Sequence, residues 1–244
     1  MMDIWEETLN WKPSPQQQAQ FQRLYELIVE GNRQLNLTRI TDPQDFWEKH
    51  LWDSLRGIKF LISEEGEEGV EKVEKKQISI IDLGTGAGFP GIPVAISVKN
   101  CTVYLVDSTS KKINFIDNIL PALNLNHVKA IICRAEEIGR DTQHRETYDL
   151  ALIRAVASAS ACAEYTLPLL KQGGLAVVYR GNWTQEDTIN MKNAVQQLGG
   201  IIESIEQFNT PLTNGDRHCL YLRKVGSTPP KFPRKVGIPT QRPL

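Results

Sequence analysis

The chain has 244 residues, of which 41% are hydrophobic and 23% are charged, and its formal net charge is −1. This composition is ordinary for a globular protein that holds one α/β domain and a small appendage. No apolar run approaches the roughly 18–20 residues that a membrane span needs, and residues 1–11 lack the pattern of a signal peptide. We therefore expect a cytoplasmic protein with no membrane partner.

The N-terminal residues 1–61 are predicted to form a helical extension. Ser14 precedes Pro15, with Gln17 at the position of a capping box. Apolar residues then recur at helical spacing and define one face: Phe21, Leu24, Tyr25, Leu27 and Ile28. The pair at 31–32 predicts a stop or a kink, and Asp42 with Pro43 predicts the start of another helix.

Residues 62–77 are predicted to form a linker or loop, because they carry six acids and three lysines but few apolar residues. A strand-and-helix domain is predicted over 78–225. Its short apolar runs lie at 78–83, 102–106, 128–133, 150–153 and 175–179, and helical stretches lie near 91–98, 110–122, 157–170 and 184–198. This alternation predicts a mostly parallel, doubly wound sheet.

Two further strands are expected at 201–208 and 218–224, with turn residues and no helix between them. They predict an antiparallel C-terminal hairpin at one edge of the sheet, which completes seven strands. A basic, proline-rich tail follows at 226–244. Such a tail can contact phosphates, although it is equally typical of a solvated segment.

The cysteines predict no metal site. They stand far apart, without a Cys-x-x-Cys pair and without a histidine at ligand spacing: Cys101, Cys133, Cys162 and Cys219. We expect free thiols that pack as small hydrophobic groups.

A glycine-rich turn is predicted directly after the first strand, where a ligand binds in an open α/β sheet. Asp82 ends that strand, and Gly84, Gly86, Gly88 and Phe89 follow before the next helix. Glycine allows a positive φ and a close approach of a ligand to the backbone. The turn also contains the G-x-G-x-x-G spacing of dinucleotide sites, which alone is a weak signal.

The acid before the turn favours a cationic ligand over a pyrophosphate. Asp82 would repel the phosphates of a dinucleotide, whereas the sulfonium and ammonium groups of S-adenosylmethionine are positive. Asp107 ends the second strand at the spacing of an acid that binds ribose hydroxyls. Its alternative role is to cap the following helix together with Ser108 or Thr109.

Two more sites lie at the ends of later strands. Ala135 and Glu136 follow the third strand, and they either contact the adenine or simply begin a helix with acids in its first turn. Arg154 ends the fourth strand, where the methyl group would be transferred. It is a candidate positioning residue, and a structural ion pair is the competing interpretation.

These residues and others resemble the RsmG (GidB) family. The likeness includes Asn36-Leu-Thr38, the segment from His50 to Leu55, the glycine turn, Arg134-Ala-Glu136, Arg154-Ala155, Arg217-His218 and the tail from Pro233 to Leu244. The resemblance implies a Rossmann-like class I methyltransferase that uses S-adenosylmethionine to methylate N7 of a guanine in 16S ribosomal RNA. It also implies cofactor contacts at Gly84, Phe89, Asp107, Ser108, Thr109, Ala135, Glu136 and Arg154.

The chain departs from the family at two places. Arg180-Gly181 stands where the family usually has Lys-Gly, and the two cations differ in geometry and hydration. The acidic segment 62–77 is also longer than expected, and no function is assigned to it.

No catalytic acid or base is predicted. Guanine N7 has a free in-plane lone pair at neutral pH, so its methylation needs alignment rather than proton removal. Arg154-Ala-Val-Ala157 stands where methyltransferases of exocyclic amines have an Asn/Asp-Pro-Pro-aromatic motif, and no Pro-Cys nucleophile is present.

The predicted RNA contacts are basic residues and a histidine that we expect around the cofactor site: Arg33, Arg39, Lys49, His50, Arg154, Arg180, Arg217, Arg234 and Lys235. The expected partner is 16S ribosomal RNA or the small ribosomal subunit, and a monomer is favoured. The alternatives are a small-molecule methyltransferase, an RNA-binding module without catalysis, and a nucleotide-dependent oxidoreductase.

Overall fold

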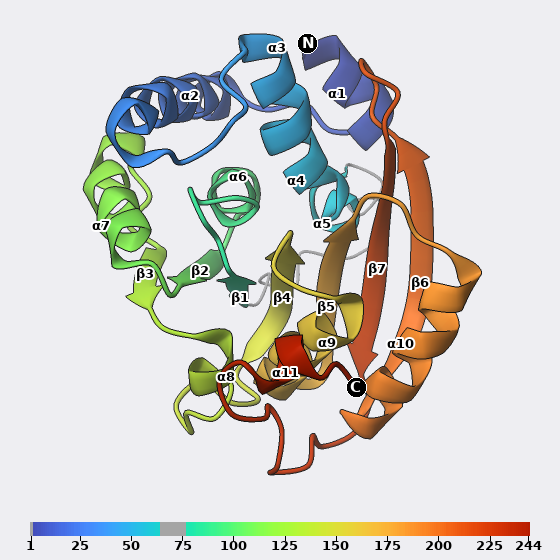
Figure 1. Cartoon of the computed structure of the whole chain (residues 1–244). Helices are drawn as coiled ribbons and strands as arrows, with labels where there is room; N and C mark the ends of the chain where they lie inside the picture. The colour runs from blue at the N-terminus through green and yellow to red at the C-terminus, as the bar shows by residue number, and fades with distance from the viewer. Residues whose placement is uncertain (1, 64–76) are drawn as a thin grey trace.

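The computed structural model describes residues 2–63 and 77–244. The charged segment predicted at 62–77 therefore lies mostly outside the described residues. The N-terminal part is helical, as predicted (Figure 1). It comprises α1 (Met2–Leu9), α2 (Pro15–Leu35), α3 (Pro43–Phe46), the π-helical turn η1 (Trp47–Trp52), α4 (Asp53–Arg56) and α5 (Lys59–Ile62).

The rest of the chain alternates between strands and helices up to the last hairpin. The strands are β1 (Ile78–Leu83), β2 (Cys101–Asp107), β3 (Val128–Ile132), β4 (Tyr148–Arg154), β5 (Leu170–Arg180), β6 (Gly200–Asn209) and β7 (Asp216–Lys224). The helices are α6 (Gly91–Ser97), α7 (Ser110–Ile119), α8 (Ala135–Ile138), α9 (Ala159–Thr166), α10 (Gln185–Gln197) and α11 (Ile238–Gln241), with short 3₁₀ turns at Pro121–Leu123 and Leu167–Leu169.

One seven-stranded sheet, in the order β3-β2-β1-β4-β5-β7-β6, forms the centre of the fold. The first five strands are parallel, and β7 pairs antiparallel with both β5 and β6. The hairpin prediction is confirmed, and β7 lies inside the sheet between β5 and the edge strand β6. The parallel register aligns Leu83 with Ile153 and Arg154 with Tyr179, so the carboxyl ends of the central strands lie side by side.

The sheet separates two hydrophobic cores, because successive strand residues point to opposite faces. Ile80 packs in the core that contains the N-terminal helices, α6 and α7, whereas Ile81 packs with α9 and α10 on the other face. Figure 1 shows α2, α6 and α7 on one side of the sheet and α8, α9 and α10 on the other. The central strands β1, β4 and β5 are mostly buried on both faces, which explains their continuous apolar runs, whereas β3 and β6 are partly exposed.

The stop predicted as one alternative at 31–32 is wrong. Helix α2 continues through Gly31 and ends at Leu35, where Asn36 adopts the left-handed conformation that caps the helix. The glycine serves packing instead: a Cβ at Gly31 would lie 2.3 Å from the Phe115 ring of α7. Both predicted helix starts are confirmed, since Ser14 forms a capping box with Gln17 and Asp42 accepts from the amides of Gln44 and Asp45.

The helix predicted near 157–170 is shorter than expected, because α9 ends at Thr166 and β5 already begins at Leu170. Gly173 and Gly174 lie inside β5, and the pairing of β4 with β5 shifts register between Tyr148 and Leu150. The short helix α8 has no periodic signal in the sequence that distinguishes it from a loop.

Candidate cofactor and acceptor site

The glycine turn between β1 and α6 has the backbone conformation that its sequence predicts. Gly84, Gly86 and Gly88 have φ values of +68°, +61° and +98°, which side chains disfavour. The amides of Gly84 and Thr85 both donate to the carbonyl of Val106 in β2, at 2.8 and 3.0 Å. A Cβ at Gly86 would approach only the Gly84 carbonyl oxygen, at 3.9 Å, so the backbone is open there.

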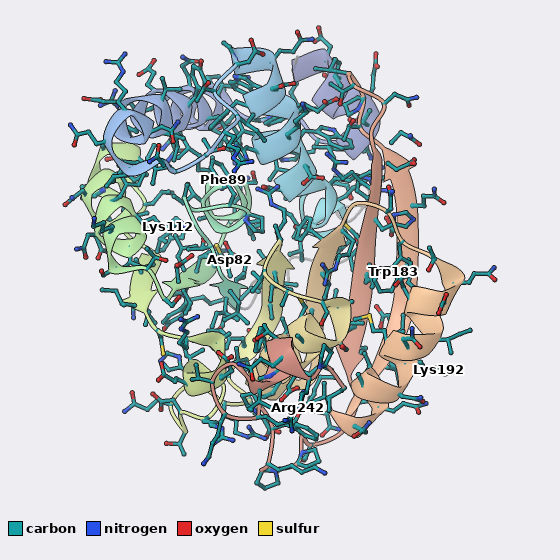
Figure 2. The ribbon with its side chains drawn as sticks, in the orientation of Figure 1. Asp82, Phe89, Lys112, Trp183, Lys192 and Arg242 are labelled. Carbon is teal, nitrogen blue, oxygen red and sulfur yellow. The ribbon has the colours of Figure 1, made fainter. Side chains whose placement is uncertain are left out.

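Asp82 is completely buried, and Figure 2 labels both it and Phe89. Its Oδ2 accepts from the Thr85 hydroxyl at 2.6 Å and from the Gly91 amide at 2.8 Å. Its Oδ1 has no hydrogen-bond partner among the described residues. Burial raises the pKa of Asp82 to about 6, while the hydrogen bonds from Thr85 and Gly91 and the charge of Arg154 act in the opposite direction.

Asp107 ends β2 on the other side of the turn. Its Oδ2 accepts from the Gly86 amide at 3.0 Å, and its Oδ1 accepts from the Thr109 amide at 2.8 Å. The carboxylate therefore holds both the glycine turn and the backbone at Thr109, with Ser108 exposed between Asp107 and Thr109. Thr109 is the N-cap of α7, which has no side-chain cap, so Asp107 does not cap the helix. Each oxygen of Asp107 keeps a second lone pair that could accept from a ribose hydroxyl.

These features fit the chemistry of S-adenosylmethionine. A buried carboxylate with an unpaired oxygen is an unfavourable arrangement that a nearby cation relieves. The open backbone at Gly86 admits a ligand. Among the described residues, the guanidinium carbon of Arg154 lies 6.0 Å from the centre of the Phe89 ring, but no lysine or arginine donates a hydrogen bond to the turn. The buried carboxylate and the open backbone of the turn therefore suit a cationic cofactor better than a dinucleotide.

Ala135 and Glu136 begin the single-turn helix α8 at the end of β3. Neither backbone amide donates a hydrogen bond within the described part of the chain, as expected for the first turn of a helix. The Glu136 side chain is buried, and its Oε1 accepts from the Tyr165 hydroxyl at 3.1 Å and from the Gly237 amide at 2.9 Å. This carboxylate thus bonds through Oε1 to α9 and the C-terminal tail, while Oε2 and the backbone amide have no hydrogen-bond partner among the described contacts.

Arg154 meets the N-terminal helices at the carboxyl end of β4. Its Nη1 lies 2.8 Å from Asp53 Oδ2 and donates to the Lys49 carbonyl at 3.2 Å. Arg217 of β7 approaches the other oxygen of Asp53, with 3.7 Å between Nε and Oδ1. Asp53 is only 6% exposed, so one buried acid joins two arginines from different strands.

His50 connects this cluster to the glycine turn. Its ring stacks on Phe89 with 4.4 Å between centroids and 10° between planes. Its Nε2 lies 2.8 Å from the Thr38 hydroxyl, and its Nδ1 lies 3.5 Å from Arg154 Nη2. Since arginine only donates, Nδ1 accepts and Nε2 carries the proton. Burial and the Arg154 charge lower the pKa of His50 to about 3, so the ring is neutral at physiological pH.

The remaining residues predicted to bind RNA do not form one cluster. Arg33, Arg39 and Lys235 are exposed, whereas Arg180 donates to the Ala157 carbonyl at 2.6 Å. Lys49 pairs with Asp45 at 2.8 Å. Arg234 differs most from the expectation of a free cation, because it forms a bidentate ion pair with the fully buried Glu164. That contact anchors the tail and uses the charge that RNA would need.

Sequence reasoning missed two acids that organise the site from η1 and α4. Glu48 is buried and accepts from the Thr213 amide at 3.0 Å, which holds the turn between β6 and β7. Asp53 belongs to the segment from His50 to Leu55 that resembles the family, but the sequence does not indicate its two arginine partners. The Tyr179 hydroxyl of β5 also donates to the Ser54 carbonyl at 2.8 Å. No local signal marks these contacts, because their partners lie more than 100 residues away.

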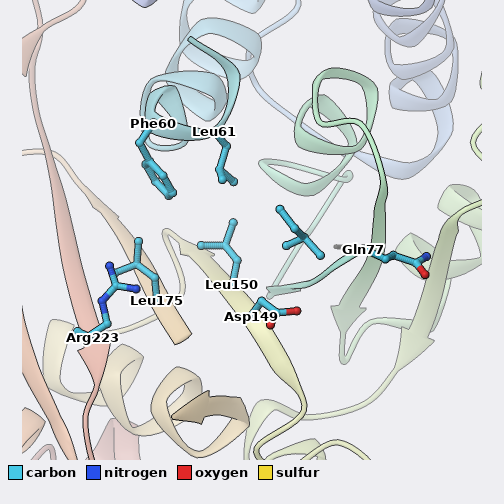
Figure 3. Close-up of a pocket in the computed structure, with 8 residues that line it drawn as sticks. Phe60, Leu61, Gln77, Asp149, Leu150, Leu175 and Arg223 are labelled. Atoms are coloured by element: carbon cyan, nitrogen blue, oxygen red, sulfur yellow. The ribbon is translucent and has the colours of Figure 1, made fainter. Parts of the chain in front are cut away.

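A cavity of about 210 Å³ lies away from this site, at the amino-terminal side of the central strands (Figure 3). Phe60 and Leu61 of the α5 region face Leu150 and Leu175 across it, and Arg223 lies at its rim. The lining is mainly apolar and includes none of the predicted site residues.

The described residues contain no group of three or more His, Cys, Asp or Glu side chains arranged to hold a metal. Three of the free cysteines are buried, and Cys133 is partly buried. None of the described helices combines the length and apolar character required to cross a membrane.

Comparison with solved structures supports the fold. The chain is similar to a SAM-dependent methyltransferase from Aquifex aeolicus, with a TM-score of 0.53, 15% identity, and coverage of 75% of this chain and 94% of that one. A SAM-dependent O-methyltransferase from Thermotoga maritima gives a TM-score of 0.51 and 16% identity, with coverage of 83% and 72%. The sheet order and these likenesses show a Rossmann-like class I methyltransferase fold.

Sequence comparison identifies the family of this chain, whereas the comparison with solved structures shows only its fold. Curated proteins named ribosomal RNA small subunit methyltransferase G are 65% identical in Nostoc punctiforme and 63% identical in Trichormus variabilis, each over all of this chain and 97% of the relative. A Synechococcus protein of the same name is 50% identical over all of this chain and 92% of its own length. The GidB family model, described as rRNA small subunit methyltransferase G, matches residues 17–220. The chain belongs to the GidB family.

Proposed function

We propose that the chain transfers a methyl group from S-adenosylmethionine to N7 of a guanine in 16S ribosomal RNA. The proposal rests on one observation: two groups of residues lie next to each other at the carboxyl ends of β1 and β4. The glycine turn with its buried Asp82 suits a cationic cofactor, and the cluster of Arg154, His50 and Asp53 lies directly against that turn through Phe89. The RNA substrate is inferred from the names of the curated relatives.

The cofactor would be held by residues from three strand ends. Asp107 would bind the ribose hydroxyls with its free lone pairs, and the amides of Ala135 and Glu136 would bind the adenine edge. Asp82 would lie near the positive end of the cofactor, with Gly84, Gly86, Gly88 and Phe89 providing the backbone surface. Residues Ser108, Thr109 and Arg154 complete the proposed cofactor contacts. When bound, S-adenosylmethionine supplies an electrophilic methyl group.

The side chains of this site orient the acceptor rather than move protons. Guanine N7 presents its lone pair without losing a proton, so no general base is required. The neutral His50 and the ion-paired Arg154 are both held in fixed positions, which favours alignment of a base next to Phe89. No residue is assigned as a catalytic acid or base.

The RNA would contact cations around this opening. Arg33, Arg39, Lys235 and Lys49 would contribute charge to phosphates, while Arg180 and Arg217 lie at the ends of β5 and β7 next to the site. We assign the chemistry to residues 78–225 and the RNA-facing helices to 1–61, with the tail at 226–244. We further propose that the protein acts as a monomer in the cytoplasm, which light scattering and cell fractionation would test.

The test uses small ribosomal subunits and naked 16S RNA from cells that lack this protein. Incubation with labelled S-adenosylmethionine is expected to label the RNA, and mass spectrometry of digested RNA should identify 7-methylguanine. The Arg154→Ala variant should lose this activity. Absence of label in both substrates contradicts the proposal.

The same assay separates the alternatives. Turnover of a small acceptor without label in RNA would favour a small-molecule methyltransferase. RNA binding without any binding of S-adenosylmethionine by calorimetry would favour a non-catalytic module. Tight NAD binding would favour an oxidoreductase.

A further inference from the structure

The C-terminal tail encloses the short helix α8 from both ends. α8 has only four residues, and an isolated single helical turn is unstable because nucleation is costly. Its position therefore depends on outside contacts. Several of those contacts come from residues 226–244, which lie beyond the match to the family model at residue 220. Figure 1 shows this last segment passing α8 before α11 lies against α9.

At the C-terminal end of α8, the tail packs against backbone. A Cβ at Gly139 would lie 2.7 Å from the Pro233 ring, so only glycine permits this approach. Arg140 donates to the Pro233 carbonyl at 2.7 Å, and Arg145 donates to the Phe232 and Thr228 carbonyls at 2.8 and 2.7 Å. These arginines act as hydrogen-bond donors to the tail and are not free for phosphates.

At the N-terminal end of α8, the tail reaches a predicted cofactor residue. The Gly237 amide donates to Glu136 Oε1, which also accepts from the Tyr165 hydroxyl of α9. Gly237 has a φ of +82°, which is the left-handed conformation that favours glycine. The Glu136 carboxylate is thus fixed between α9 and the tail, and it fixes the first turn of α8.

A buried ion pair holds the tail in this position. Arg234 donates from Nη2 to Glu164 Oε2 at 2.6 Å and from Nε to Oε1 at 2.9 Å, and the Arg234 amide donates to Oε1 at 2.7 Å. Glu164 is fully buried, so the loss of Arg234 leaves an unpaired buried charge. The tail is therefore an ordered part of the fold.

We propose that residues 233–244 form a strap that positions the first turn of α8 and thereby sets the affinity for the adenine end of S-adenosylmethionine. The inference rests on the proposed function, which assigns adenine to the amides of Ala135 and Glu136. Arg234, Gly237 and the Glu136 carboxylate are positioning residues, since they act through the α8 backbone. Cofactor binding and tail docking are then coupled, and the coupling is reciprocal.

The test compares the full chain with a variant that lacks residues 233–244 and with the double variant Glu164→Gln/Arg234→Gln. The double variant removes the ion pair without leaving a charge in the core, which protects the fold. The matched control is Gln241→Ala, which changes an exposed side chain of the same tail. Thermal unfolding identifies any variant that fails to fold.

We expect the Kd for S-adenosylhomocysteine and the KM for S-adenosylmethionine to rise at least tenfold in both strap variants. In the double variant, which keeps Lys235, the kcat at saturating cofactor and the KM for RNA should stay within twofold of the full chain. Inhibition by 5′-methylthioadenosine, which keeps the adenine but lacks the amino-acid end, should weaken in parallel. A synthetic peptide of residues 233–244 should restore part of the affinity to the truncated variant.

Hydrogen exchange tests the reciprocal effect in the unaltered protein. Saturation with S-adenosylhomocysteine should slow amide exchange in residues 233–241, and the Gln241→Ala control should show the same protection. The proposal is overturned if exchange there is unchanged, or if the double variant binds S-adenosylhomocysteine as the full chain does. A rise in the KM for RNA alone in the double variant would also overturn it, since the ion pair would then act on RNA binding rather than on the cofactor. If the full chain itself binds no S-adenosylhomocysteine, the proposed function fails first.

Discussion

The glycine turn and the Asp53 cluster are neighbours in space, but they are assembled in different ways. The hydrogen bonds of the turn join residues close in sequence, since Asp82 and Gly91 are nine positions apart and Gly86 and Asp107 are 21 positions apart. The cluster joins Asp53 to Arg154 across 101 residues, and the nearby contact of Glu48 with Thr213 spans 165. One part of the site is local in the chain, and the other exists only after the whole domain has folded.

This difference shows how the sequence encodes cofactor binding on the one hand and orientation of the acceptor on the other. A backbone site for a cofactor needs glycines at alternate positions, and that requirement is visible in a short motif. A surface that orients an acceptor needs side chains from several elements, here η1, α4, β4 and β7. Disturbing the turn should therefore affect cofactor binding first, whereas disturbing the cluster should affect methyl transfer first.

The largest expected effect comes from filling the open backbone of the turn. Gly86→Gln places a side chain where a Cβ meets almost nothing, and should lower the affinity for S-adenosylmethionine at least 100-fold, as measured by calorimetry. The left-handed backbone adds about 1–2 kcal/mol of strain. The matched control is Gly173→Gln, which has a φ of +82° and open space in β5. Equal loss of affinity in both variants would contradict a ligand site at Gly86.

The second effect tests the cluster. Arg154→Ala leaves Asp53 buried with only the more distant Arg217, and should reduce methyl transfer to RNA about 30-fold or more while S-adenosylmethionine still binds within about tenfold. The free energy of unfolding should fall by about 3 kcal/mol, because one partner of a mostly buried ion pair is lost.

Asp53→Asn provides the comparison for this prediction, since it removes the charge and keeps the shape of the side chain. Its loss of methyl transfer should be smaller than that of Arg154→Ala, and the double variant should lose less than the sum of the two. Strict additivity of the two losses would show that the pair does not act as a unit.

The third prediction returns to the turn and uses pH. Ionised Asp82 attracts a cation, and its pKa is about 6, so protonation below pH 6 should raise the Kd for S-adenosylmethionine up to tenfold per pH unit. Titration calorimetry between pH 5 and 8 measures this dependence. In Asp82→Asn the affinity should be weak and independent of pH over the same range. A Kd that does not change below pH 6 in the unaltered protein would exclude this role for Asp82.

The smallest effect concerns His50. Its pKa in the folded protein is about 3, below the value near 6.5 of an unfolded histidine. Between these values the unfolded chain binds the extra proton, so stability is retained above pH 6.5 and falls as the pH drops toward 3. His50 contributes at most about 1.4 kcal/mol per pH unit to this loss. Denaturant unfolding of His50→Gln should show a shallower loss on acidification, and nitrogen NMR should find the imidazole neutral at pH 5.

Much of the fold was predictable because its signals are local. The apolar run 78–83 coincides with β1, and the caps at Ser14 and Asp42 begin helices as expected. The failures also have local explanations. Gly31 resembles a helix stop in the sequence, yet it is an interior residue that lets α2 approach Phe115. The helix α8 was only one of two alternatives for Ala135 and Glu136, because a single turn has no periodicity.

The candidate site was predictable only in part. The positive φ values of the turn follow from its glycines, and the strand ends that carry Asp107 and Arg154 follow from the alternation of strands and helices. The hydrogen-bond and ion-pair partners of these side chains could not be predicted from the sequence. Arg234 is typical of an RNA-binding cation in sequence, but in the fold it neutralises Glu164. Charge in a sequence does not reveal whether an opposite charge lies beside it.

The sequence by itself determined the α/β architecture, the glycine turn, the preference for a cationic cofactor and the likeness to one family. These depend on periodicity and on backbone conformations that neighbouring residues impose. Only the tertiary structure decided that β7 inserts beside β5, that Asp53 joins Arg154 and Arg217, and that the tail encloses α8. Buried polar groups must find partners, and the chain supplies those partners from distant segments that no local pattern connects.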